Sequence, residues 1–201
     1  INIMTKRGRR GDHVKGGIDF GDYKYRNYYA SISGARDFAS YNAFFKREKT
    51  NGYRLNGDYD GIDFMAAMTI FPANCLNIDF SGGYHKDWYG LAGGLQRSEI
   101  DQLGYRGSMT PDDRVKIETT FLQVRPSIKY SEGSMDHFID LDAWGRKKRT
   151  NMINWAELPA WGIPWYPSWD TSQIDSAGGS VKYKNIYEDE RVTNVFTLGL
   201  D

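Results

Sequence analysis

Residues 76–85 read L-N-I-D-F-S-G-G-Y-H, and their apolar side chains recur at nearly every second position. Two sets of side chains alternate along this stretch, one apolar and one polar: Leu76, Ile78, Phe80 and Tyr84, against Asn77, Asp79, Ser81 and His85. A period of two residues is typical of a β-strand whose two faces meet different surroundings. The stretch therefore predicts a strand with one apolar and one polar face.

The same period continues through most of the chain. We predict nine strands, at residues 13–20, 26–34, 38–47, 60–71, 76–87, 117–131, 135–148, 174–187 and 191–200. Several of them have ten or more residues, whereas strands of soluble sheets average five or six. Long strands of this kind are typical of segments that cross a bilayer at a tilt.

The connections between these strands alternate in length. Those after the third, fifth and seventh strands are long, at residues 48–59, 88–116 and 149–173. Those after the second, fourth, sixth and eighth strands have only three or four residues. In an up-and-down meander every long loop then falls on one rim, which is the habit of outer-membrane barrels. We expect an all-β, antiparallel, up-and-down transmembrane β-barrel, although alternation by itself also fits a soluble β-sandwich.

The composition excludes several classes of protein. The 201 residues carry 26 basic and 26 acidic side chains, so the net charge is zero and a general nucleic-acid binder is not expected. Cys75 is the only cysteine, so no disulfide forms within the chain. Residues 64–73 form the most apolar stretch, which is too short for a membrane-spanning helix. No arrangement of side chains typical of nucleophilic catalysis is present, and we do not expect an enzyme.

Five stretches of the sequence resemble one known family. Residues 1–8, I-N-I-M-T-K-R-G, and residues 16–21, G-G-I-D-F-G, are similar to the last plug strand and the first barrel strand of the TonB-dependent outer-membrane receptors. Residues 44–54 end in the G-Y-R of a family loop. Residues 81–95 contain Y-G-L-A-G-G-L, close to the Y-G-L-P-G-G-L of many members, and residues 109–113, M-T-P-D-D, precede the sixth strand.

This resemblance implies a domain plan and a function. Residues 1–10 would end the plug and link it to the barrel, and residues 11–201 would form about nine strands of a barrel of the 22-strand type. The chain would be a fragment of a receptor in the outer membrane of a Gram-negative bacterium. That receptor would take up a scarce solute such as a ferric siderophore, haem or cobalamin. Its partner for energy would be the TonB–ExbB–ExbD complex, reached through the plug.

The candidate ligand-binding residues lie in the expected outer loops. The segment 155–169 reads W-A-E-L-P-A-W-G-I-P-W-Y-P-S-W, in which prolines stiffen a cluster of aromatic side chains. Such a cluster offers large, rigid contact area, for example to a planar metal chelate. We take as candidates the aromatic residues of this segment with three from the 88–116 loop: Trp155, Trp161, Trp165, Tyr166 and Trp169, with Trp88, Tyr89 and Arg97. A self-packed loop cap is the alternative.

Two further candidate sites are charged. Asp58, Asp60 and Asp63 form a loose acidic cluster that could hold calcium in an outer loop, although their spacing matches no EF-hand. Lys147, Lys148 and Arg149 lie at the outer end of the seventh strand, where they could contact lipopolysaccharide phosphates. No cofactor other than this calcium is expected.

Two other functions remain open at this point. A passive porin or structural barrel would have the same strands without an upstream plug. A soluble β-sandwich that binds glycans through its tryptophans would bury Ile62, Phe64, Met68, Ile78 and Phe80 in a protein core. The upstream sequence would distinguish the porin from the receptor, and the surroundings of the apolar face would distinguish the sandwich from the receptor.

Overall fold

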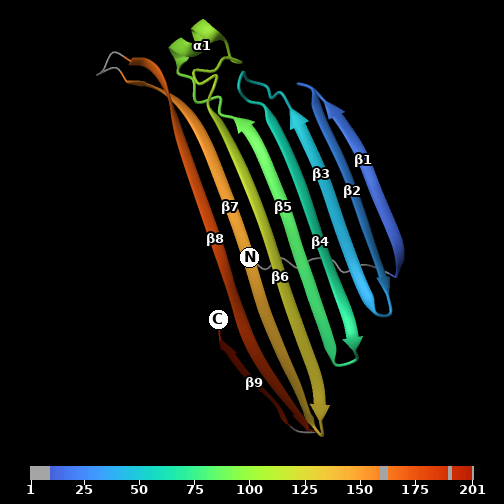
Figure 1. The fold of residues 1–201 in the computed structure, drawn as a ribbon. Coiled ribbons are helices and arrows are strands. Elements are labelled where there is room, and N and C mark those ends of the chain that lie inside the picture. Colours follow the sequence, from blue (N-terminus) through green and yellow to red (C-terminus); the bar gives the residue numbers. More distant parts are fainter. Residues whose placement is uncertain (1–9, 159–162, 190–191, 201) are drawn as a thin grey trace.

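The computed structural model describes residues 10–158, 163–189 and 192–200. It contains one antiparallel sheet whose nine strands lie side by side in sequence order, with a single short helix at one end (Figure 1). The strands are β1 Gly11–Gly21, β2 Tyr25–Arg36, β3 Ala39–Thr50, β4 Tyr59–Ala73, β5 Leu76–Gly90, β6 Arg114–Glu132, β7 Met135–Leu158, β8 Ile163–Asp189 and β9 Val192–Leu200. The helix is α1 Arg97–Leu103.

The nine predicted strands and their up-and-down order are confirmed. Each of the eight pairings joins consecutive strands, and all of them are antiparallel. Among the described residues the sheet is not closed, because β1 and β9 do not pair with each other. The fold is therefore an open stretch of meander, not a complete barrel. The helical part of the described chain has no segment with the length and apolarity that a membrane crossing requires.

Two of the expected long connections differ from the prediction. The connection 149–173 was expected to be a loop, but β7 and β8 continue through most of it as a long hairpin in which Trp155 pairs with Pro167. β9 pairs only with residues 181–189 of β8, so among the described residues the N-terminal part of β8 has one unpaired edge. Pro164 and Pro167 are tolerated in that part because an unpaired edge needs no backbone N–H donor. The second difference is the helix α1, which lies inside the expected loop 88–116. The backbone N–H of Gln96 donates to the Glu99 carboxylate at 2.6 Å, and this hydrogen bond caps the first turn of α1.

Register sorts the side chains into two faces. One set of cross-strand neighbours runs through seven strands and consists of small or aliphatic residues: Ile32, Ala43, Ala66, Gly82, Leu122, Gly145 and Ala177. We call the side of the sheet that holds this row the apolar face. A second row lies three residues away along each strand, on the opposite side, and is polar along much of its length: Lys46, Asp63, His85, Thr119 and Lys148. That side is the polar face.

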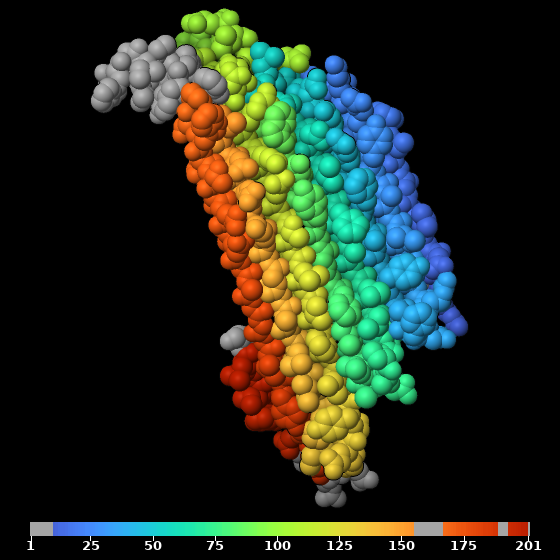
Figure 2. Space-filling model, in the orientation of Figure 1, coloured from blue at the N-terminus to red at the C-terminus, as the bar shows by residue number. Residues whose placement is uncertain are grey.

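The apolar face is left uncovered by the described residues. Val14, Phe20 and Leu122 of this face are 73%, 71% and 62% exposed. The deeply buried polar residues of the strands, Asn27 and Thr69 among them, lie on the polar face instead. This distribution is the reverse of a soluble sheet, which covers its apolar side. Figure 2 shows the strands forming one continuous sheet, coloured in sequence order.

The core expected for a soluble sandwich is absent from the described residues. Ile62 and Ile78 are half-buried and Leu141 is 38% exposed, all on the same apolar face. No second layer of described residues lies over them, because the sheet order contains a single sheet and α1 lies at its loop end. Within this chain, their shielding comes from neighbours in the same sheet.

Candidate functional site at the loop end of the sheet

The two longest described connections lie at the same end of the sheet. Residues 51–58 join β3 to β4, and residues 91–113 join β5 to β6 and include α1. In an up-and-down order these links share an end with the β1–β2 turn, with the C-terminal end of β7 and with the N-terminal end of β8 (Figure 1). Side chains from segments far apart in the sequence therefore meet here.

Arg54 locks the two connections together. Its guanidinium donates to the carbonyl oxygen of Gly107 at 2.8 and 3.1 Å and to that of Ala92 at 3.0 Å, and it also donates to the carbonyl of Gly93. Only arginine presents five N–H donors in a fixed planar fork, which suits several carbonyls at once. Thus the G-Y-R and L-A-G-G stretches noted in the sequence are partners in space.

Asn56 repeats this role beside Arg54. Its side-chain amide lies 2.5 Å from the carbonyl oxygen of Thr110, 2.8 Å from that of Asp113 and 3.2 Å from that of Leu91. Its backbone adopts a φ of 53°, in the left-handed region that asparagine tolerates better than most side chains. The loop 51–58 is thus fixed to both ends of the segment 91–113.

An aromatic and cationic stack joins the β1–β2 turn to the same assembly. The rings of Tyr23 and Tyr53 meet edge to face with centroids 5.7 Å apart. The Arg106 guanidinium lies 5.2 Å from the Tyr23 ring centroid and 5.7 Å from that of Tyr53, and its Nε donates to the Tyr53 carbonyl at 2.8 Å. Cation–π contacts of this kind add to the hydrogen bonds that order the loops.

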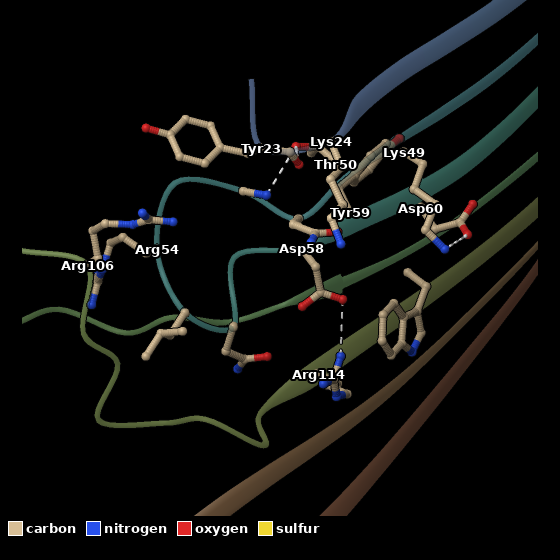
Figure 3. A pocket seen from close by; sticks show the side chains of 15 residues that line it. Tyr23, Lys24, Lys49, Thr50, Arg54, Asp58, Tyr59, Asp60, Arg106 and Arg114 are labelled. Atoms are coloured by element: carbon tan, nitrogen blue, oxygen red, sulfur yellow. Dashed lines mark hydrogen bonds and ion pairs between the residues drawn. The ribbon is translucent and has the colours of Figure 1, made fainter. Parts of the chain in front are cut away.

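A cavity of about 560 Å³ opens between these loops and the strand ends (Figure 3). Asp58 accepts from Arg114 at 3.3 Å, and the Arg114 guanidinium lies 4.3 Å from the centroid of the Trp88 ring. Basic side chains outnumber the two acidic ones among the residues that line it: Lys24, Lys49, Arg54, Arg106 and Arg114 against Asp58 and Asp60. The cavity therefore favours anionic groups over cationic ones.

The candidate residues Trp88 and Tyr89 lie on opposite faces of the sheet. Successive residues of a strand point to opposite faces. Trp88 shares the apolar face with its neighbour Asp60 and lines the cavity, whereas Tyr89 pairs with Tyr59 on the polar face. Arg97 is exposed on α1, where it pairs with Asp101 at 3.4 Å, and it does not line the cavity.

The tryptophan-rich segment is only partly described. Trp161 lies outside the described residues, and so do the side chains of Trp155, Trp165 and Tyr166, whose backbones belong to β7 and β8. Trp169 is 73% exposed, pairs with Ile153 across the hairpin and does not line the cavity with Trp88. A joint aromatic binding surface thus stays a prediction.

The three carboxylates considered for calcium are separated. Asp58 pairs with Arg114, and Asp60 lies 3.4 Å from Arg47 and 3.3 Å from Lys49. Asp63 lies on the polar face, 2.6 Å from a ring nitrogen of a histidine. Among the described residues no group of three or more histidine, cysteine or acidic side chains is placed to hold a metal ion. The structure does not bring these carboxylates together.

One cluster on the polar face was not singled out from the sequence. His85 lies between two carboxylates, with Nδ1 at 2.6 Å from Asp63 and Nε2 at 3.3 Å from Asp87. The second oxygen of Asp87 is buried and has no hydrogen-bond partner among the described residues. The period of two places His85 and Asp87 on one face, but only the register of β4 against β5 adds Asp63.

Comparisons with known proteins identify no family. No protein-family model matches the chain, and no curated protein matches it. Among solved structures, the crystal structure of the ferric citrate transporter FecA in its unliganded form aligns with a TM-score of 0.42 and 11% identity. The alignment covers 94% of this chain and 40% of the transporter, so the chain spans well under half the length of that protein. A likeness at this level does not assign a function.

Proposed function

We propose that this chain forms part of the wall of an outer-membrane transport barrel, with its apolar face toward lipid and its polar face toward the lumen. The observation that carries the proposal is the exposure of the apolar face, with Leu122 at 62% and Phe64 at 44%. An uncovered apolar surface of this extent needs an apolar environment. In a membrane barrel that environment is the hydrocarbon of the bilayer.

The height of the apolar surface supports this. On β6 the side chains that share the apolar face, from Thr120 to Tyr130, carry no charge, and Glu118 precedes them. Ten residues at about 3.3 Å each span about 33 Å along the strand. At a tilt of about 40° this becomes about 25 Å, the height of the apolar band of outer-membrane barrels.

Aromatic side chains border this band. At the end with short turns, Tyr130 stacks on His137 with ring centroids 4.5 Å apart, and His137 lies 6.0 Å from Tyr183. Tyr183 continues the series to Phe196 at 6.5 Å. At the loop end Trp88 lies on the same face, one position beyond Lys86 on that side of β5. Aromatic girdles at both interfaces are typical of barrels in membranes.

The polar face suits a water-filled or plugged interior. Thr69 donates to Asp79 at 2.5 Å, and Gln123 donates to Asp142 at 2.8 and 3.0 Å, so adjacent strands are joined by hydrogen bonds between side chains. Together with the His85 cluster they give a surface that would be costly to place in hydrocarbon. We assign this face to the lumen.

The transport function rests on the sequence stretches that resemble TonB-dependent receptors. Two of them, around Arg54 and Ala92, interlock in the structure, which is a reason to keep them as one functional unit. The proposed cargo is a scarce solute such as a ferric siderophore, haem or cobalamin, selected by the outer loops. Energy would come from the TonB–ExbB–ExbD complex through a plug domain.

A growth experiment tests this proposal. Cells that carry the complete gene, or a deletion of it, are grown with ferric siderophores, haem or cobalamin as the sole source of the limiting nutrient. We expect a requirement for the gene with one of these, lost when TonB is inactivated. Uptake that is independent of TonB would favour a passive porin. Recovery of the complete protein from the aqueous phase without detergent would favour a soluble sandwich.

A further inference from the structure

Four cationic side chains gather on the apolar face, at the edge of its uncharged band. Arg47 and Lys49 come from β3, Lys86 from β5 and Lys116 from β6. The register places them on the same face as Ile62 and Trp88. Because the central band of this face is apolar, a local group of cations at its edge requires an explanation.

The carboxylates present are too few to neutralise this group. Arg47 and Lys49 share Asp60, at 3.4 and 3.3 Å. Lys86 and Lys116 share Glu118, at 3.7 and 3.1 Å. Two carboxylates therefore face four cations, and the patch keeps a net positive charge. All four cationic side chains stay accessible, with 37% to 50% of their surface exposed.

The patch is hollowed. A cavity of about 300 Å³ is lined by three of these cations together with one carboxylate, one aliphatic and one aromatic side chain: Arg47, Lys86, Lys116, Asp60, Ile62 and Trp88. It therefore combines cationic donors with an apolar wall. Ligands that match such a lining carry anionic oxygen atoms beside a hydrophobic part.

The positive surface continues along the neighbouring strand. Lys147 and Arg149 of β7 lie on the apolar face, opposite Thr120 and Glu118 of β6. Lys148, between them, points to the polar face, so only two members of the basic run predicted to meet lipopolysaccharide belong to this surface. Arg149 donates to Gln173 at 3.1 Å.

We propose that this patch, formed by Arg47, Lys49, Lys86 and Lys116, binds the phosphorylated sugar headgroup of an outer-leaflet glycolipid. Charge complementarity places the phosphates against the cations, and the adjoining apolar band receives the acyl chains. The inference rests on the proposed function, because it takes the apolar face as the one in contact with lipid. A free anion would bind the cations but would make no contact with the adjoining apolar band.

Paired variants in the complete protein test the assignment. The double variant Arg47→Gln/Lys86→Gln removes two cations from the patch. The control is Lys46→Gln, which removes the cation next to Arg47 in sequence, on the polar face, where it pairs with Glu48. Binding is measured by native mass spectrometry and by titration with diphosphorylated lipid A, dephosphorylated lipid A and the free diphosphorylated disaccharide. Thermal unfolding in detergent identifies variants that fail to fold, for which the single variants replace the double.

We expect the double variant to bind diphosphorylated lipid A at least about tenfold more weakly, because it loses two charge-assisted contacts. The control should bind as the unmodified protein does. Dephosphorylated lipid A should bind weakly to all forms, and the free disaccharide more weakly than the lipid. Equal binding by double variant and control, or equal binding of lipid and free disaccharide, would overturn the inference.

The proposed function is tested separately by insertion of the protein into bilayers of neutral lipid. If the protein does not insert there, the assignment of the apolar face to lipid fails. If it inserts but shows no preference for phosphorylated lipid, only the headgroup site fails.

Discussion

The guanidinium of Arg54 donates two hydrogen bonds to the carbonyl oxygen of Gly107, which lies fifty-three residues further along the chain. The same side chain also reaches the carbonyl of Ala92. One arginine thus determines how the loop 51–58 meets the segment 91–113. The loop end is ordered by contacts between connections, beyond those of the strands that carry them.

Replacement of Arg54 should loosen both connections. We expect Arg54→Lys to accelerate amide hydrogen exchange at Leu55 and Leu91, because a single ammonium cannot satisfy carbonyls on two segments. Exchange at the strand residue Phe80 should stay as it was. The control is Arg97→Lys, an exposed position on α1 that should change neither loop. Unchanged exchange at Leu55 and Leu91 would show that the strands alone order the loops.

Gly52 should be intolerant of any side chain. Its φ is 72°, and a Cβ atom there would lie 2.0 Å from the carbonyl oxygen of Gly57. We expect Gly52→Ala to lower the free energy of unfolding by at least about 1–2 kcal/mol through strain in the left-handed region, with an added clash. Gly94→Ala is the control, since its added Cβ meets open space. Chemical denaturation of the complete protein measures both.

The strands could be predicted because they depend on local pattern. The alternating residues 76–85 lie within β5, and the short turns lie where the alternating segments end. The extension of the β7–β8 hairpin could not be predicted in this way, because the prolines of 155–169 read as loop signals. Among the described residues, Pro164 and Pro167 are tolerated because one edge of β8 is unpaired there, which is a property of the sheet.

The candidate site was less predictable, because it depends on register and on contacts between distant segments. Trp88 and Tyr89 are adjacent in sequence, but their side chains lie on opposite faces because successive residues of a strand alternate. The bonds from Arg54 to Gly107 have no sequence signal of their own beyond the G-Y-R stretch. Pairing of Asp63 with His85 follows from the β4–β5 register, which no single-strand pattern reveals.

The polar face should depend on the hydrogen bond between Thr69 and Asp79. Thr69 is 6% exposed and its hydroxyl donates to Asp79 at 2.5 Å. We expect Thr69→Val to lower the free energy of unfolding by about 1–3 kcal/mol, because a half-buried carboxylate loses its donor. Thr69→Ser should restore most of the loss, since it keeps the hydroxyl. Equal destabilisation by both variants would attribute the effect to packing.

Neighbouring positions on β6 should respond oppositely to a charge. Leu122→Lys places an ammonium on the apolar face, two residues inside the uncharged band, and we expect a loss of about 1–3 kcal/mol in the stability of the protein folded in bilayers. Gln123→Lys points to the polar face, where Asp142 is a ready partner, and should cost much less. Urea titration in lipid vesicles compares them. Similar costs at both positions would contradict the assignment of faces.

The most direct test labels these two positions with a fluorophore. The complete protein is prepared with Cys75→Ser, which removes the exposed cysteine of the β4–β5 turn, and then with Leu122→Cys or Gln123→Cys. After reconstitution, quenching is measured with nitroxide-labelled acyl chains and with aqueous iodide. Our account predicts quenching by the acyl chains at position 122 and by iodide, or by neither agent, at position 123. Iodide quenching at position 122 with none by acyl chains would contradict it.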